Sequence, residues 1–224
     1  MASEVDVCNL GLSHIGAEAQ VVAISPPDGS VEAGLCKRFY PIVRRELIES
    51  SNWQFALKRV ALAEVTNPST VWQYAYELPS DCIDALRILP LATIGEAGLF
   101  WPAGVSTEWP LNAQLLDDLF SERGSSNFTI EGTTLLTNEP EAVLKYKADV
   151  VDTTKFTGLF VTAFGMLMAS YLAGPIIKGQ EGTRIGASWR DSAMVMIARA
   201  GAGEANNSSE RAEHVSEFIR ARGC

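Results

Sequence analysis

The sequence contains only two histidines, His14 and His214, and no H-E-x-x-H pair or cluster of cysteine with histidine. It therefore lacks the ligand sets from which zinc sites are usually built. It also lacks the glycine-rich loops that hold nucleotide phosphates, G-x-x-x-x-G-K-[ST] and G-x-G-x-x-G, and the G-x-S-x-G turn of serine hydrolases. We accordingly predict no catalytic centre, no metal ion and no cofactor.

The four cysteines, Cys8, Cys36, Cys82 and Cys224, include no C-x-x-C pair. Cys8 and Cys36 fall in helix-like apolar patterns, so we predict buried thiols in a reducing compartment in preference to a disulfide framework. Hydrophobic residues make up 47% of the chain, which is enough to bury a core without disulfides or metal. The amino terminus has neither the basic segment nor the apolar run of a secretory signal peptide.

Positive charge is scarce, with Lys+Arg 18 against Asp+Glu 27, which gives a net charge of −9 over 224 residues. Affinity for phosphates comes largely from lysine and arginine, so we predict no general binding of nucleic acid or anionic membrane. Lys37, Arg38, Arg44 and Arg45 form one local basic cluster, which we interpret as a solvated helix face.

Apolar periodicity predicts helices over residues 3–16, 31–50 and 183–200, and a third helix, in chain order, within the uncharged run 156–177. Ser3 and Asp6 are spaced as a capping box, and Gly16 is placed to end the first helix. We expect Pro41 to kink the second helix, because proline removes one backbone hydrogen bond. We expect Gly174 and Pro175 to end the third, and His14 to lie outside the apolar face of the first.

The third helix contains no charged residue between Phe156 and Ile177, which is long enough to cross a bilayer. Its glycines and hydroxyl residues dilute the hydrophobicity, so we favour a helix buried on two sides over a membrane span. One stripe carries large residues, Phe160, Phe164, Leu167 and Tyr171. A second stripe carries small residues, which predict a close helix–helix or subunit interface: Gly158, Thr162, Gly165, Ala169 and Ala173.

Alternation with period two predicts extended chain at Trp53–Leu57, at Tyr74–Leu78 and over residues 128–150. We interpret 128–150 as a single hairpin whose turn is Asn138–Glu141. Lys145 and Lys147 alternate with apolar residues there, so we expect both on the solvated face. Residues 90–127 are rich in Gly and Pro and predict a long loop or insertion. Within them, Asp117, Asp118 and Glu122 form an acidic cluster that we interpret as a solvated helix face.

The carboxy-terminal segment combines a small, polar stretch, GAGEANNSSE, with a short amphipathic tail. We interpret residues 1–200 as one domain and residues 201–224 as a flexible arm. Large apolar residues beside arginines are typical of segments that become ordered on a partner, although folding back on the same subunit is the alternative. The candidate partner-binding residues are Arg211, Val215, Phe218, Ile219, Arg220 and Arg222.

Four segments, in this order, resemble the head-to-tail adaptors of short-tailed bacteriophages, also called tail tubular protein A. They are EVDVCNLGLSHIGAEAQV, DGSVEAGLCKRFYPIVRRELIESSNWQFALKRVALA, YAYELPSDCIDALRIL and FTIEGTTLLTNEPEAVLKYKADVVDTTKFTGLFVTAFGMLMASYLA. The resemblance covers residues 3–200, except that the 92–127 region departs from the family pattern. Each motif concerns packing, so the resemblance depends on their order.

The resemblance implies an α+β fold, mainly a helical bundle with a small antiparallel sheet or hairpin and an extended carboxy-terminal arm. It implies a ring of twelve subunits at the head–tail interface of the virion, assembled in the host cytoplasm. The ring would contact the portal protein, through the candidate arm residues, and a tail nozzle or tail tube protein. DNA would pass through its channel without specific binding, and no membrane is involved. Twelve copies at −9 each would carry a formal charge of about −108, which repels phosphate.

Two other functions remain open at this point. One is a virion-associated peptidoglycan hydrolase that uses a carboxylate pair, for which Asp117, Asp118 and Glu122 are the candidates. The other is a membrane protein anchored by residues 156–177.

Overall fold

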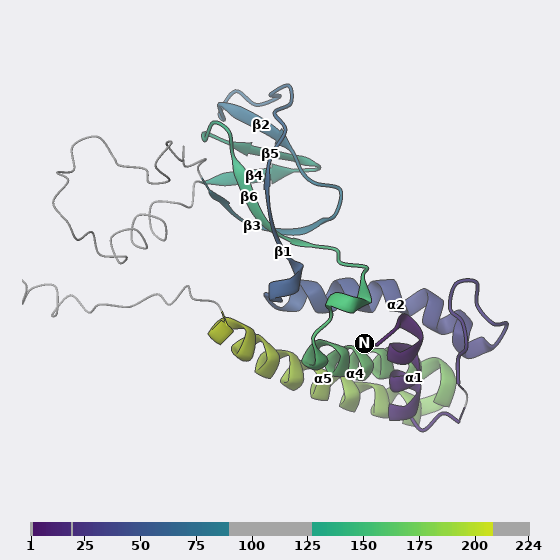
Figure 1. Ribbon diagram of the computed structural model, residues 1–224. Helices are drawn as coiled ribbons and strands as arrows, with labels where there is room; N and C mark the ends of the chain where they lie inside the picture. The colour runs from purple at the N-terminus through teal and green to yellow at the C-terminus, as the bar shows by residue number, and fades with distance from the viewer. Residues whose placement is uncertain (1, 19, 90–126, 208–224) are drawn as a thin grey trace, which may run out of the picture. The chain divides into compact units, whose positions relative to one another are not determined.

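The computed structural model describes residues 2–18, 20–89 and 127–207, and its fold is α+β, as predicted (Figure 1). Its helices and strands are α1 (Glu4–His14), α2 (Val31–Ser50), β1 (Leu57–Ala61), β2 (Tyr74–Glu77), β3 (Cys82–Leu89), β4 (Phe128–Glu131), β5 (Thr134–Thr137), β6 (Val143–Ala148), α4 (Gly158–Ile177) and α5 (Gly179–Asn207). The chain divides into two compact units. The helical unit comprises residues 1–59, 79–86 and 145–205, and the sheet unit comprises 60–78, 87–144 and 206–224.

Local sequence signals define α1 and α2. The Ser3 side chain accepts a hydrogen bond from the Asp6 N–H while the Asp6 carboxylate accepts from the Ser3 N–H, so the predicted capping box is confirmed. Gly16 has a φ of +72°, a conformation that glycine adopts at little cost after a helix. Ser30 caps α2, and Pro41 lies inside that helix on an exposed face.

Helices α4 and α5 pack as an antiparallel pair joined by a sharp turn at Lys178 and Gly179, where both φ angles are positive (Figure 1). The prediction that Gly174 and Pro175 end α4 is wrong, because the helix continues to Ile177. Proline this close to a carboxyl end removes only its own N–H bond, and the Lys178 N–H still bonds to the Gly174 carbonyl. The turn at Lys178 ends α4.

The boundaries predicted for α5 are also wrong at both ends. The helix begins at Gly179, ahead of the expected cap at Thr183, and it continues through Asn207. Residues 201–207, which we predicted to be linker, are therefore helical. Gly201 lies close to Ser51, since a Cβ atom added to it would lie 2.7 Å from the Ser51 Oγ. This tertiary contact and the neighbouring alanines favour helix where composition alone indicated a linker.

The core of the helical unit is built from α1, α2 and α4 around a cluster of aromatic rings. Phe160 lies at its centre, with the rings of Trp53 and Phe55 both edge-on to it at 4.9 Å between centroids. Trp53 is fully buried, and its indole N–H donates to the Leu47 carbonyl at 2.7 Å. This arrangement requires a 3₁₀ turn at Gln54–Ala56, so the prediction of extended chain from Trp53 holds only from Leu57 onward.

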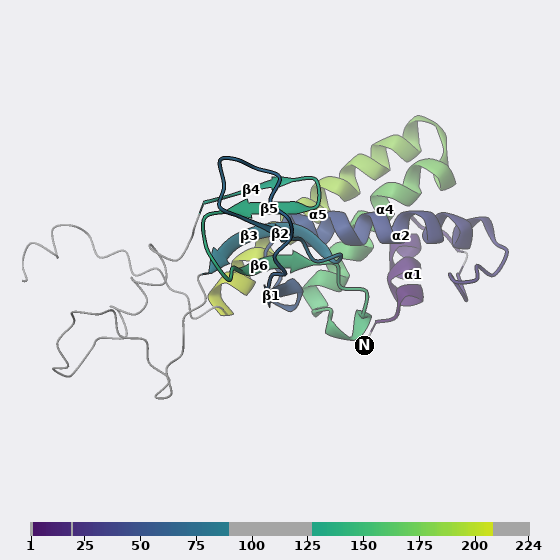
Figure 2. The same ribbon diagram turned by 90° about the horizontal axis from the view of Figure 1, so that it is seen from above.

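The sheet unit contains the antiparallel sheet β2–β5–β4, whose strands lie side by side in that order in Figure 2. Ala75 is paired with Leu136 and Tyr76 with Leu135, and all four side chains are buried. The Tyr76 hydroxyl donates to the Glu139 carbonyl at 3.0 Å.

The single hairpin predicted for residues 128–150 is wrong. The hairpin is formed by β4 and β5, and its two-residue turn is Gly132 and Thr133. Gly132 has a φ of +62°, as the first central residue of a type II′ turn requires. The next strand, β6, belongs to the other three-stranded sheet, β1–β6–β3. The alternation of apolar and polar residues correctly predicted extended chain in β4, β5 and β6. It does not show which strand pairs with which.

Helix α4 is long and apolar enough to cross a membrane by length and composition, and half of the residues in its most apolar window are buried inside the protein. The buried residues include Phe160, Phe164 and Leu167, which pack into the core of the helical unit. The large apolar side chains of α4 therefore pack against other parts of the same chain.

Candidate functional site

The small-residue stripe of α4 lies at a close crossing with α1. A Cβ atom added to Gly165 would lie 2.5 Å from Leu10 Cδ2 and 2.7 Å from Leu10 Cγ. A Cβ atom added to Gly11 would lie 2.9 Å from the Met168 Cβ and 3.4 Å from the Ala169 backbone nitrogen. Neither position has room for a side chain, so the two helices approach as closely as glycine permits.

The same stripe reaches the crossing of α4 with α5 at its other end. A Cβ atom on Gly182 would lie 2.8 Å from the Ala173 carbonyl oxygen, and one on Gly186 would lie 2.9 Å from the Ser170 carbonyl oxygen. Of the predicted interface residues, Gly165, Ala169 and Ala173 thus lie at helix crossings within one chain.

Gly158 and Thr162, the other two predicted interface residues, lie outside both crossings. A Cβ atom on Gly158 would have no neighbour within 4 Å, and the residue is exposed. The Thr162 hydroxyl donates to the Gly158 carbonyl at 3.0 Å, which is an ordinary bond within one helix. Within the described ranges, no neighbour lies close to the Gly158 end of the stripe.

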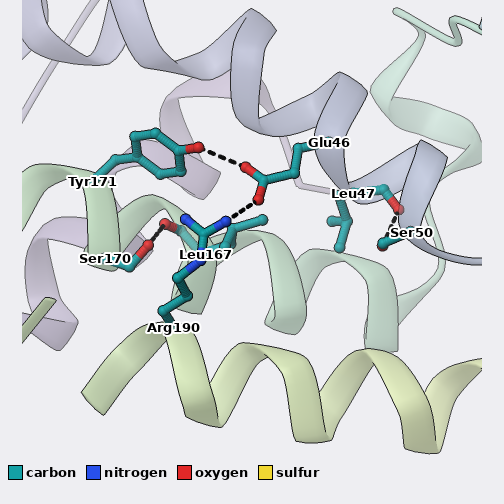
Figure 3. A network of polar contacts seen from close by, with 7 residues as sticks. All are labelled: Glu46, Leu47, Ser50, Leu167, Ser170, Tyr171 and Arg190. Atoms are coloured by element: carbon teal, nitrogen blue, oxygen red, sulfur yellow. Dashed lines mark hydrogen bonds and ion pairs between the residues drawn. The ribbon is translucent and has the colours of Figure 1, made fainter. Parts of the chain in front are cut away.

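Next to the α4–α5 crossing lies a polar network that involves three helices (Figure 3). The Glu46 carboxylate on α2 accepts from the Tyr171 hydroxyl at 2.6 Å and from the Arg190 guanidinium at 2.5 Å. The hydrogen bond to Glu46 and partial burial both raise the pKa of Tyr171. The Arg190 guanidinium also lies 5.8 Å from the centre of the Tyr171 ring. The network holds α2, α4 and α5 in register, and it borders a shallow pocket lined by Ser170, Gly174, Gly182, Thr183, Gly186 and Ala187.

A second set of charges lies on α2 and β6. Arg44 is only 8% exposed, and its Nε donates to the Asp149 carboxylate at 3.0 Å. Lys147 is 6% exposed, and its Nζ donates to the Glu49 carbonyl at 2.7 Å and lies 3.3 Å from Asp84. The predictions of solvated positions are therefore wrong for Arg44 and Lys147. Each can be buried because its cationic group is bonded to a specific acceptor. The spacing of apolar residues along a helix or strand does not show where such an acceptor lies.

A third set of polar contacts in the helical unit is centred on the Asp81 carboxylate. It accepts from the Lys58 ammonium at 2.6 Å and from the Tyr146 hydroxyl at 3.0 Å. The bond from Lys58 is the main cause that lowers the pKa of Asp81. Burial first, and the bond to Asp81 second, raise the pKa of Tyr146 to about 12. The part of the chain that the structure describes contains no group of His, Cys, Asp or Glu side chains that could hold a metal ion here or elsewhere.

The outer face of α5 carries exposed apolar residues, with the exposed Asp191 among them. We define the α5 strip as five exposed residues at helical spacing: Ala187, Met194, Val195, Ala198 and Ala202. Val195 is 71% exposed and Met194 is 41% exposed. The strip lies opposite the buried face of α5, which carries Ala193, Ile197 and Ala200. The α5 strip was not predicted from the sequence, because three of its five residues are alanines, which give a weak apolar signal. His14, expected outside the apolar face of α1, is half-buried with its ring 4.4 Å from that of Trp189 on α5.

The other predicted site residues lie outside the described residues. They are Asp117, Asp118, Glu122, Arg211, Val215, Phe218, Ile219, Arg220 and Arg222. No protein-family model matches the chain, and no curated protein matches it in sequence.

Proposed function

We propose that this protein is a structural subunit of a phage head-to-tail adaptor, a ring of twelve copies between the portal and the tail nozzle or tail tube. In this proposal the helical unit forms a bundle around a channel, and the carboxy-terminal arm binds the portal. The ordered series of segments over residues 3–200 supports the proposal, since outside residues 92–127 it resembles that family in the same order. The role is mechanical and requires no catalysis.

The observation that carries the proposal is the α5 strip. A ring subunit must present an apolar surface to its neighbour, and exposed apolar strips on soluble chains mark such contacts. Val195 is exposed to 71% at the centre of the strip. We propose that a neighbouring copy of the chain covers this strip in the ring.

The charge of the chain agrees with passage of DNA through the ring. At −9 per subunit, an acidic channel repels phosphate and keeps the genome from adhering to the wall. Adhesion of DNA to the wall would instead need arginine and lysine aimed at the phosphate backbone. In the helical unit the most buried arginine, Arg44, is already paired with Asp149.

Mass measurement in solution tests the assembly. Twelve copies of the 24.2 kDa chain would give about 290 kDa by light scattering or native mass spectrometry, alone or bound to portal-bearing heads. A chain that stays monomeric both alone and with portal would contradict the proposal.

A matched pair of variants tests the strip. Val195→Asp should block ring formation, because it buries an unpaired charge in the interface, while circular dichroism stays unchanged. Val71→Asp is the control, since Val71 is 79% exposed in the sheet unit and should not affect assembly. If Val195→Asp assembles like the control, the strip is not the interface.

The arm is tested by a truncation placed after Asn207, because α5 continues to that residue. The truncated chain should fold and form rings but no longer bind portal-bearing heads. Phe218→Ala with Ile219→Ala should reduce binding similarly, since it removes the apolar anchors and keeps the arginines. If both variants still bind portal-bearing heads, the arm is not the portal-binding segment.

An assay on peptidoglycan separates this function from the hydrolase alternative. We expect no turnover by the purified protein. Turnover that disappears in Asp117→Asn or Glu122→Gln would establish the enzyme instead.

A further inference from the structure

The outer face of α2 carries charge at both ends and an apolar residue between them. We define the α2 face as Arg38, Ile42, Arg45 and Glu49, which follow one another at spacings of four, three and four residues. These spacings place the four side chains on one side of the helix. All four residues are exposed, and Ile42 is exposed to 50%. Arg45 lies 4.0 Å from the Asp149 carboxylate, which offsets its charge.

The α5 strip repeats this spacing with the charges in the opposite order. Four exposed residues of α5 are also separated by four, three and four positions: Asp191, Val195, Ala198 and Ala202. Arg199, which is exposed as well, lies beside Ala198 on the same side of the helix. The outer face of α5 therefore begins with a negative charge and carries a positive charge further on. The α2 face begins with a positive charge and ends with a negative one.

The charges of both faces lack partners inside one subunit. Among the described residues, no ion pair involves the side chains that carry them: Arg38, Glu49, Asp191 and Arg199. Exposed apolar side chains with polar groups around them are typical of surfaces that bind another protein. Each face has this composition, with Ile42 at the centre of one and Val195 at the centre of the other.

Helices α2 and α5 run in the same direction through the helical unit. Glu46 on α2 accepts a hydrogen bond from Arg190 on α5, and further along both helices Ser51 lies next to Gly201. Contacts that advance together along two helices show that the helices run the same way. Figure 3 shows α2 and α5 on either side of the Glu46–Arg190 contact, in which neither outer face takes part.

A ring limits how two such faces can meet, and this step rests on the proposed function. Neighbours in a ring of twelve are related by a rotation of about 30°, one twelfth of a turn. This rotation changes the direction of any helix by at most that angle. Helix α5 of one copy and α2 of the next must therefore run in the same direction, close to the crossing angle of about 20° at which many helices pack.

In this orientation the charges at the start of the two faces are opposite. With Val195 placed against Ile42, the equal spacing of four residues brings Asp191 of one copy to Arg38 of the next. Both charged side chains then lie at the rim of an apolar contact, where opposite charges fix the register.

The charges at the other end are opposite as well. Arg199 lies about 6 Å beyond the centre of its strip and Glu49 about 10 Å beyond the centre of its face, a difference that a long arginine side chain spans. In the reverse direction Asp191 would meet Glu49 and Arg199 would meet Arg38, so like charges would repel. Charge and ring geometry therefore favour the same direction, although neither depends on the other.

We propose that the α5 strip of one copy packs in parallel against the α2 face of the next copy. The contact is heterologous, so it repeats around the ring and leaves no unused copy of either face when the ring closes. A strip that packed against the same strip of a second copy would instead form a two-fold dimer.

Crosslinking tests which surfaces meet. The background is Cys82→Ser with Cys224→Ser, because the other two cysteines are fully buried. In this background Ile42→Cys combined with Val195→Cys should give, on mild oxidation, a ladder of covalent oligomers that extends to about twelve copies and collapses in reductant. The two single-cysteine variants are the controls, and neither should form a crosslink.

Charge exchange tests the register. Asp191→Arg places a like charge against Arg38, and Arg38→Asp places one against Asp191. Because the contact repeats in every copy, we expect either variant to lose the species of about 290 kDa. The variant with both changes should restore it. Lys37→Asp is the matched control, since it makes the same change of charge about 100° around α2 and should assemble normally.

The outcomes separate this inference from the adaptor function itself. An unsubstituted chain that stays monomeric, alone and with portal, overturns both. Rings that form normally in every charge variant, or that are lost in Lys37→Asp as in Arg38→Asp, overturn only the pairing of these faces. Covalent dimers from Val195→Cys alone, the absence of a ladder from the double-cysteine chain, or a charge exchange that restores nothing would also overturn it.

Discussion

Four glycines in the helical unit lie where a second helix passes closely, whereas Gly132 in the sheet unit lies at a turn with open space around it. A Cβ atom on Gly11, Gly165, Gly182 or Gly186 would lie within 3.0 Å of a neighbouring helix. A Cβ atom on Gly132 would have no neighbour within 4 Å, but its φ is +62°. Glycine therefore provides space at the four helix crossings and backbone freedom at the turn of Gly132, and the two roles respond differently to substitution.

The units also differ in how they bury polar groups. The helical unit buries two cationic side chains, Arg44 and Lys147, each on a specific acceptor. Among the described residues of the sheet unit, the buried polar residue is Thr137, whose hydroxyl donates to the Asn127 carbonyl at 3.1 Å. Loss of a partner should therefore cost more in the helical unit, because an unpaired buried charge is worse than an unpaired hydroxyl.

The largest effect should come from filling the space at the α1–α4 crossing. Gly165→Leu forces the new side chain into Leu10, and we expect the free energy of unfolding to fall by about 3 kcal/mol. Chemical denaturation measures the change. Gly158→Leu on the same helix is the control, since its Cβ meets nothing, and it should change stability by less than about 0.5 kcal/mol. Equal losses in both variants would show that the crossing is not tight.

The next effect concerns the buried ion pair. Arg44→Met keeps much of the side-chain volume but leaves Asp149 without its principal partner, so we expect a loss of about 2 kcal/mol. Arg45→Met is the matched control, because Arg45 is 60% exposed at its side chain and lies 4.0 Å from the same carboxylate. It should cost no more than about 0.5 kcal/mol. If Arg45→Met lowered the free energy of unfolding as much as Arg44→Met, the stabilisation would come from net charge and not from the buried ion pair.

A smaller effect should separate the two roles of glycine. Gly132→Ala should destabilise the β4–β5 hairpin by about 1 kcal/mol, because alanine resists a positive φ even where space is open. Gly34→Ala, inside α2 with no neighbour for its Cβ, should instead stabilise by about 0.5–1 kcal/mol. Hydrogen exchange would locate each change in its own unit. If both variants shifted stability in the same direction, the distinction between the two roles would fail.

The smallest effect is a dependence of stability on pH. The pKa of Asp81 is lowered in the folded protein, mainly by the Lys58 ammonium, so the unfolded chain binds the proton more readily. The stability that this contact contributes is present above the unfolded pKa and is lost as pH falls through the folded pKa. Asp81→Asn should therefore lose less stability than the natural chain between about pH 5 and about pH 2. Parallel unfolding curves at several pH values provide the measurement, and identical slopes would exclude Asp81 as the cause.

Local signals in the sequence were sufficient for several elements. Helix α2 runs from Val31 to Ser50, as the apolar stripe and turn residues predicted, and the Ser3–Asp6 capping box forms as expected. The small-residue stripe on α4 was also visible as a pattern, and Gly165 and Ala173 lie at crossings. These features depend on residues three or four positions apart, which the sequence displays directly.

The remaining features depend on contacts between distant residues. Periodicity could not place β6 beside β1 and β3, because strand alternation is the same for any neighbour. It could not show that Lys147 would reach the Glu49 carbonyl. Helix α5 continues beyond its predicted end, where Gly201 packs against Ser51, a residue distant in the sequence. The sequence by itself determined where most helices start and which faces are apolar, since these follow from local spacing. Only the tertiary structure decided which polar groups are buried, because burial depends on partners that folding brings together.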